Sequence, residues 1–197
     1  LERVNALLEE KDLILKETHH RVKNNMSIIS SLLSLQAGEV EGTECANLLQ
    51  DAAGRAQSMM VLYDKLYRSE GLRELMLKDF LEPLVQEIIK TFTLSFSVET
   101  RLNIENLQLD AKVLSALGII INELVTNSMK HAFAGRREGS ISIEAHTTDE
   151  SLTLTYSDDG IGMPSTVNFN SENTFGLQLI RLLSRQIKAE VEVKREN

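Results

Sequence analysis

Apolar residues in the first 36 positions recur at intervals of three and four, and neither glycine nor proline interrupts them. This spacing is the heptad pattern of a long helix that packs in a bundle. The middle of the apolar stripe is polar, because Lys11, Thr18 and Asn25 occupy d positions between Val4 and Leu32. The a positions are Leu1, Leu8, Leu15, Val22 and Ile29.

A second helix is predicted after GEVEGT, residues 38 to 43, whose two glycines are typical of a turn. Residues 44 to 68 again carry apolar side chains at steps of three and four. These side chains are Leu48, Ala52, Ala56, Met59, Tyr63 and Leu66. A single helical hairpin cannot bury an apolar stripe on both helices, so we expect a second copy to complete a four-helix bundle, which makes the chain a homodimer.

Helices and strands alternate beyond about residue 73. Residues 77 to 92 have a helical pattern, and an alternating segment ending at Ile104 is typical of a strand. Asp110 has the side chain of an N-cap for a helix from 111 to 132. The segments SISIEAH and SLTLTYS alternate around TTDE, which predicts an antiparallel hairpin.

The remaining segments complete an α+β fold class. Residues 160 to 174 have the composition of a loop, a helix is expected to begin near Gly176, and AEVEVK predicts a short final strand. We expect two domains, a helical hairpin at residues 1 to 72 and a layer of helices on antiparallel strands at residues 73 to 197.

The composition of the chain mainly excludes certain classes of function. The formal charge of -8 argues against nucleic-acid binding and against an anionic membrane surface, since both attract basic patches. The single cysteine, Cys45, precludes an internal disulfide and fits a reducing compartment. No apolar run approaches the ~20 residues of a membrane-spanning helix. Because the sequence begins at Leu1 and not at methionine, we expect a fragment of a longer protein. We expect this fragment to be cytoplasmic and the full-length protein to be soluble or anchored to a membrane through an upstream segment.

Chemistry-bearing side chains cluster in three places in the second half. Glu123, Asn127, Lys130 and His131 share one stripe of the predicted helix, where they could ligate a hard cation and meet phosphate, although a solvated helix face has the same pattern. SDDGIGMP, residues 157 to 164, places a carboxylate and two glycines at a strand end, a pattern also found in ordinary turns.

The third place is NTFGLQLI, residues 173 to 180, which opens a helix with polar residues and a glycine. This arrangement suits the binding of an anion, or it is an ordinary helix cap.

Three segments resemble, in order, the N, G1 and G2 boxes of the GHKL ATPase superfamily: NELVTNSMKHAF, DDGIGMP and TFGLQLI. KETHHRVKNN, residues 16 to 25, resembles the phosphoacceptor box of sensor histidine kinases of the HisKA type 2 subclass, which are related to the HWE kinases. The resemblance spans about residues 12 to 188.

The resemblance implies a dimeric four-helix bundle followed by an α/β sandwich that binds ATP and Mg²⁺. It makes Asn127 the Mg²⁺ ligand, Glu123 the residue that polarises a group or accepts a proton, and Lys130 and His131 phosphate or ribose contacts. Asp158 becomes the reader of adenine. Glycines 160 and 162 then shape that wall of the site, and residues 163 to 175 form a lid; the contacts at its end are Thr174, Gly176 and Leu177. The family usually ends in a further strand containing Gly-Thr, which this sequence lacks after VKREN.

Heptad positions distinguish the two histidines. His19 falls at e, beside the seam, and His20 falls at f, which faces farthest from the bundle axis. The resemblance also selects His20, since the reactive histidine of related kinases precedes an arginine, here Arg21. Glu17 and Asn24 share a helical face with His20, as a candidate base and as a residue that could orient water for dephosphorylation.

The expected function is autophosphorylation of His20 from Mg-ATP, followed by transfer to an aspartate of a response-regulator receiver domain. An upstream sensor domain is expected in the full-length chain, and neither nucleic-acid binding nor membrane insertion is expected of this fragment. Two alternatives remain at this point: a non-catalytic phosphotransfer or scaffold protein with a degenerate ATP domain, and an ATPase that uses water as acceptor.

Overall fold

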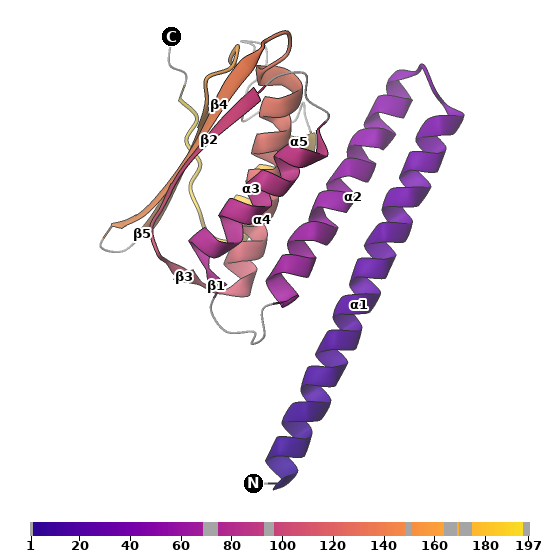
Figure 1. Ribbon diagram of the computed structural model, residues 1–197, viewed down its shortest axis with the longest axis vertical. Coiled ribbons are helices and arrows are strands. Elements are labelled where there is room, and N and C mark those ends of the chain that lie inside the picture. The colour runs from indigo at the N-terminus through magenta and orange to yellow at the C-terminus, as the bar shows by residue number, and fades with distance from the viewer. Residues whose placement is uncertain are drawn as a thin grey trace. The chain divides into compact units, whose positions relative to one another are not determined.

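A computed structural model describes residues 2–68, 75–92, 97–148, 151–163, 169 and 175–194. The chain divides into two compact units, Leu1–Glu70 and Gly71–Asn197 (Figure 1). Over these described ranges, no helix is both long enough and apolar enough to cross a membrane.

The first unit is a hairpin of two helices, α1 (Glu2–Glu39) and α2 (Glu44–Arg68), as the apolar spacing predicted. Thr43 organises the turn, because its hydroxyl donates to the Val40 carbonyl at 2.7 Å and accepts from the Ala46 N–H at 3.2 Å. The second contact is that of an N-cap, so Thr43 ends the turn and begins α2. The helix α1 has 38 residues and α2 has 25, so the first part of α1 extends beyond its partner (Figure 1).

Among the described apolar residues of the α1 heptad stripe, only Val22 lies on the seam between the helices. Half-buried or buried side chains on α1 recur at Val22, Met26, Leu33 and Ala37, and the Ser30 hydroxyl donates to the Ala53 carbonyl at 3.1 Å. The stripe residues Val4, Ile29 and Leu32 are instead more than half exposed, as is Leu48 on α2. The apolar pattern predicted the two helices, which are present, but these stripe residues stay uncovered within one hairpin, and their packing against a second copy stays a prediction. The side chains of Leu1, Leu8, Leu15, Tyr63 and Leu66 lie outside the described residues.

The second unit is a mixed sheet with helices on one face, which confirms the α+β class. The three-stranded sheet has the order β2-β4-β5, and a two-stranded sheet joins β1 to β3. The elements are β1 (Leu75–Met76), α3 (Leu77–Thr91), β2 (Ser97–Ile104), β3 (Gln108–Leu109), α4 (Ala111–Asn127), a π-helix (Ser128–Ala132), β4 (Glu138–Thr148), β5 (Ser151–Asp158) and α5 (Phe175–Gln186).

The pairing of β2 corrects one expectation. β4 and β5 form the predicted antiparallel hairpin, but β2 pairs parallel to β4, with Ser97 opposite Glu138. A parallel pair requires a crossover connection, and the chain makes it through α4. This places the carboxyl-terminal end of α4 near the end of the sheet where β4 begins and β5 ends.

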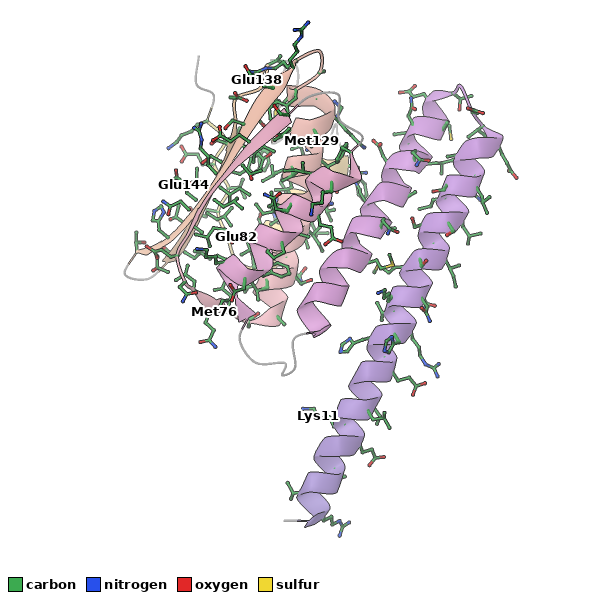
Figure 2. All side chains as sticks on the ribbon, viewed as in Figure 1. Lys11, Met76, Glu82, Met129, Glu138 and Glu144 are labelled. Carbon is green, nitrogen blue, oxygen red and sulfur yellow. The ribbon has the colours of Figure 1, made fainter. Side chains whose placement is uncertain are left out.

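Helices α3, α4 and α5 cover one face of the sheet (Figure 1). Ile141, Ile143 and Ala145 on β4 are fully or almost fully buried, while Glu144 points from the other face (Figure 2). The predicted N-cap of α4 is present, since the Asp110 carboxylate accepts from the Val113 N–H at 2.8 Å. The α4–α5 contact buries Ala116, Ile120, Leu177, Ile180 and Leu183.

The predicted final strand is absent. Residues 189 to 194 are described, form no strand, and are exposed throughout; Val191 and Val193 are 44% and 45% exposed. An alternating sequence becomes a strand only when a neighbour completes its hydrogen bonds, and no described strand pairs with this segment.

Candidate functional site

The polar end of α4 departs from the predicted regular helix. From Ser128 to Ala132 the chain forms a π-helix, in which the Phe133 N–H donates to the Ser128 carbonyl at 3.1 Å. π-helical turns are rare and are found often at functional sites. Because the turn is wider than an α-helical one, the residues after Asn127 do not continue the stripe that α-helical spacing predicts.

The four stripe residues have very different exposures. Glu123 is only 1% exposed, Asn127 and Lys130 are half-buried, and His131 is exposed. A solvated helix face is therefore the wrong interpretation for Glu123. Burying a carboxyl group is costly unless neighbouring groups compensate it, so Glu123 remains a candidate site residue in a buried environment.

Asp158 is held from two sides at the end of β5. The Ser128 hydroxyl donates to Asp158 Oδ2 at 2.6 Å, and the Gly160 N–H donates to Oδ1 at 3.0 Å. Tyr156 OH lies 2.7 Å from the same Ser128 oxygen. Burial raises the pKa of the Tyr156 hydroxyl well above its usual value, the Asp158 charge raises it further, and the bond to Ser128 partly offsets these effects.

The loop after β5 is packed against the end of the π-helix. The Ile161 N–H donates to the Ala132 carbonyl at 2.9 Å, and Gly160 lies directly against Ala132. Gly162 has a positive φ of 77° with open space around it. The two glycines named from sequence thus serve different needs, close packing at 160 and backbone conformation at 162.

A second set of contacts ties this loop to the start of β4. The Ser140 N–H donates to Asp159 Oδ1 at 2.7 Å, and the Asp159 N–H donates to the Ser140 carbonyl at 3.1 Å. The Arg136 guanidinium donates to the Asp159 carbonyl. These contacts fix the end of β5, where Asp158 lies, against the start of β4.

The G2-like segment is described only in part. Gly176 and Leu177 are buried at the start of α5, and Leu177 belongs to the core that joins α5 to α4. Phe169 packs on the same core, and its carbonyl accepts from the Arg181 guanidinium at 2.6 Å. Thr174 and most of the predicted lid lie outside the described residues.

The two histidines differ in exposure. His19 is half-buried, and His20 is exposed. Partial burial lowers the pKa of His19 below its usual value, and the neighbouring His20 lowers it further through its charge. The exposed face also carries Asn24.

Glu17 is already engaged by a cation on the same helix. The Arg21 Nη2 and Nε donate to Glu17 Oε1 at 2.6 Å and 3.1 Å, and both side chains are well exposed. Such a surface pair contributes little to stability. It does orient the Glu17 carboxylate, three residues before His20 on α1.

Ser128, Tyr156 and Asp159 were not predicted from sequence as site residues. Ser128 follows Asn127 directly in the sequence, and nothing in the sequence pattern indicates that its hydroxyl contacts the end of β5, because that contact depends on the π-helix. Tyr156 was part of the predicted strand SLTLTYS and was given no role. Among the described side chains, no three of the types His, Cys, Asp and Glu gather as a metal site.

Two family models match most of the chain. Residues 17–92 match the model HisKA_2, described as a histidine kinase, and residues 113–197 match HATPase_c, described as a histidine kinase-, DNA gyrase B- and HSP90-like ATPase.

Curated relatives that are named as sensor histidine kinases match nearly the whole length of this chain. Sensor histidine kinase PdtaS of Mycobacterium tuberculosis is 30% identical over 188 residues, which are 93% of this chain and 36% of that protein. PdtaS of Mycolicibacterium smegmatis is 31% identical over 190 residues, covering 93% of this chain and 37% of that protein. The chain thus spans a little over a third of these relatives.

The solved histidine kinase domain of the Erythrobacter litoralis blue-light activated histidine kinase has the same fold. It superposes with a TM-score of 0.65 at 22% identity, covering 95% of this chain and 88% of that one. This likeness concerns the fold. The two family models, which together match residues 17–92 and 113–197, show that the chain belongs to the histidine kinase family, as a HisKA_2 segment followed by an ATPase segment of the histidine kinase, gyrase B and HSP90 type.

Proposed function

We propose that the chain is a sensor histidine kinase core that phosphorylates His20 from Mg-ATP and passes the phosphoryl group to an aspartate of a response-regulator receiver domain. The observation that carries this proposal is the exposure of His20, on a face of α1 separate from the α2 seam. A side chain that must meet first a nucleotide and then a partner protein needs that access. His19, half-buried, does not have it to the same degree.

In this proposal residues 1–72 dimerise and carry the phosphoacceptor, and residues 73–197 bind ATP. Asp158 supports an adenine contact, because its carboxylate is exposed while both oxygens are held in place. An exocyclic amine is a donor that such an acceptor can bind. Lys130 and His131 would meet the phosphates or the ribose, and the helix start at Gly176 would face an anion.

Asn127 is the oxygen donor that would hold Mg²⁺. Mg²⁺ is usually held by one or two protein oxygens together with phosphate oxygens and water, so the small protein donor set suits a metal that arrives with the nucleotide. When bound, the ion would neutralise charge on the phosphates. Asn127 would contribute its amide oxygen, and Glu123 would polarise a group or accept a proton.

Transfer to His20 forms a bond between a ring nitrogen and the γ-phosphorus while the bond from that phosphorus to the ADP oxygen breaks. The second ring nitrogen then releases its proton. Glu17, three residues earlier on α1, is the proposed acceptor, and Arg21 orients its carboxylate through Oε1. Asn24, one turn later, would orient water when the phosphoryl group is hydrolysed.

A homodimer is proposed from the uncovered stripe on the hairpin. Exposed apolar side chains on neighbouring turns of α1 and α2 are large enough to bury against a second copy; they are Ile28, Ile29, Leu32, Leu35 and Leu48. His20 lies away from this stripe and from the α2 seam, which agrees with an outward position in a four-helix bundle. Since ATP is the proposed donor, we place this core in the cytoplasm, downstream of a sensor domain in the full-length protein.

The decisive experiment incubates the chain with γ-labelled ATP and Mg²⁺ and compares wild type with His19→Gln and His20→Gln. We expect base-stable, acid-labile label that disappears only in His20→Gln, and its transfer to a receiver domain. Label that persists in His20→Gln would refute the assignment. Phosphate release without labelled protein would indicate an ATPase that uses water, and neither label nor release would indicate a non-catalytic scaffold with a degenerate ATP domain.

A further inference from the structure

A chain of hydroxyl groups runs from the interior to Asp158. Ser128 is 2% exposed, and its oxygen lies 2.7 Å from Tyr156 OH and 2.6 Å from Asp158 Oδ2. The three residues come from two elements, since Ser128 opens the π-helix and the other two end β5. The π-helix therefore brings a buried hydroxyl to the one carboxylate predicted to read the base.

The hydrogen bonds from Tyr156 to Ser128 and from Ser128 to Asp158 have one consistent direction. An ionised carboxylate only accepts, and serine has a single hydroxyl hydrogen, so Ser128 must donate to Asp158. Its oxygen is then left to accept, and Tyr156 must be the donor. Burial raises the pKa of Tyr156, which keeps its proton in place for this role.

The second oxygen of the carboxylate is also held. The Gly160 N–H donates to Oδ1 at 3.0 Å, so each oxygen has one internal donor and the plane of the group cannot turn freely. Asp158 itself remains exposed, and a carboxylate oxygen accepts more than one hydrogen bond. It consequently presents a fixed acceptor to a ligand and has no donor to offer.

We propose that Ser128 and Tyr156 are positioning residues that set the base selectivity of the nucleotide site, by holding Asp158 as a fixed acceptor that takes a 6-aminopurine and rejects a 6-oxopurine. An amino group donates to the carboxylate, whereas a carbonyl oxygen at the same place repels it. The inference rests on the proposed nucleotide site, where Asp158 is the proposed adenine contact, and adds to it the two residues that hold this carboxylate in place.

The test measures dissociation constants of Mg-ATP and Mg-GTP by calorimetry for wild type, Ser128→Ala and Tyr156→Phe, with Thr155→Ala as control on the exposed face of β5. Hydrogen bonds to charged groups suggest a loss of about tenfold in the preference for ATP in Ser128→Ala and a smaller loss in Tyr156→Phe. Thr155→Ala should keep the wild-type ratio. Each variant is checked for folding by circular dichroism, and Tyr156→Phe, which keeps the ring, serves as an independent arm if Ser128→Ala unfolds.

A double-mutant cycle separates positioning from general destabilisation. In an Asp158→Asn background, Ser128→Ala should no longer change the ATP-to-GTP ratio, because the residue through which it acts is altered. An unchanged ratio in folded Ser128→Ala and Tyr156→Phe, with ATP binding intact, would overturn this inference alone. Absence of any nucleotide binding by wild type would overturn both the inference and the proposed function.

Discussion

Gly160 lies so close to Ala132 that an added Cβ would stand 2.3 Å from the Ala132 Cβ and 2.7 Å from its carbonyl oxygen. That same carbonyl accepts from the Ile161 N–H. The loop that follows Asp158 is thus seated on the π-helix through backbone contact that only a glycine permits.

Alanine or asparagine at position 160 should therefore displace this loop. We expect Gly160→Ala to lower the free energy of unfolding by about 1–3 kcal/mol, as overpacking does, and to weaken ATP binding. Gly135 provides the matched control, since its φ of 77° is strained for alanine but tolerated by asparagine, its surroundings are open, and it lies outside the proposed site. Calorimetry of Gly135→Asn should show near-normal ATP affinity, whereas Gly160→Asn should not; equal behaviour at both positions would contradict the packing argument.

Glu123→Gln tests the buried carboxyl group. The substitution keeps the shape of a side chain that is 1% exposed and removes its charge and its capacity to accept a proton. If Glu123 assists phosphoryl transfer, the rate of His20 phosphorylation should fall by about 10²–10⁴. ATP affinity, measured in parallel, should change far less. A variant with a normal rate would assign Glu123 to structure alone.

Glu17→Gln tests the proposed proton acceptor on α1. We expect slower phosphorylation of His20 with unchanged ATP affinity, because the residue belongs to the phosphoacceptor hairpin. Arg21→Ala is the companion variant: it removes the contacts to Oε1 without removing the carboxylate, so it should retain more activity than Glu17→Gln. Time courses with labelled ATP compare the three proteins, and equal rates in all of them would exclude Glu17 as the base.

The pKa of His19 gives a prediction about pH. It lies below the usual value of 6.5 because of burial first and of His20 second, so protonating His19 is less favourable in the folded hairpin than in the unfolded chain. The free energy of unfolding should be insensitive to His19 above pH 6.5 and should decrease as the pH falls below it.

Nuclear magnetic resonance titration checks this directly. The His19 midpoint should lie below 6.5 in wild type, and His20→Gln should raise it without restoring it fully, because burial remains. A midpoint at or above 6.5 in wild type would contradict the environment described for His19.

Charges on the exposed stripe of α1 should break the proposed dimer. Ile29→Glu and Leu32→Glu place carboxylates on side chains that are 51% and 55% exposed in the single hairpin and would be buried between copies. We expect each to raise the dimer dissociation constant at least about tenfold, by sedimentation velocity. Ser27→Glu, exposed on α1 outside the stripe, should leave it unchanged. A wild type that stays monomeric at high concentration would refute the dimer.

The sequence predicted what local chemistry decides. The Asp110 cap, the β4–β5 hairpin and the helical hairpin depend on neighbours in the chain, and all three are present. The parallel pairing of β2 with β4 depends on segments about 40 residues apart, and alternation in AEVEVK says nothing about whether a partner strand exists.

Of the residues named from sequence, Asp158 and Gly160 lie against the π-helix that follows α4, and their part in a nucleotide site stays a prediction. The π-helix itself and the contact of Ser128 with Asp158 arise from tertiary structure. Heptad spacing likewise identified an apolar surface on α1 without showing that α2 packs on a different one. Periodicity gives the faces of a helix, and the partner of each face is set by the rest of the fold.

The helix α1 runs without a break from Glu2 to Glu39 and carries His20 near its middle. Because an α-helix rises about 1.5 Å per residue, His20 stands roughly 27 Å from the first turn along a rod with no proline or glycine hinge between them. With no such hinge, a displacement applied at the start of α1 would reach the imidazole as rotation or sliding of the whole helix. In the proposed sensor kinase, upstream input would therefore act by changing the direction or the position of His20.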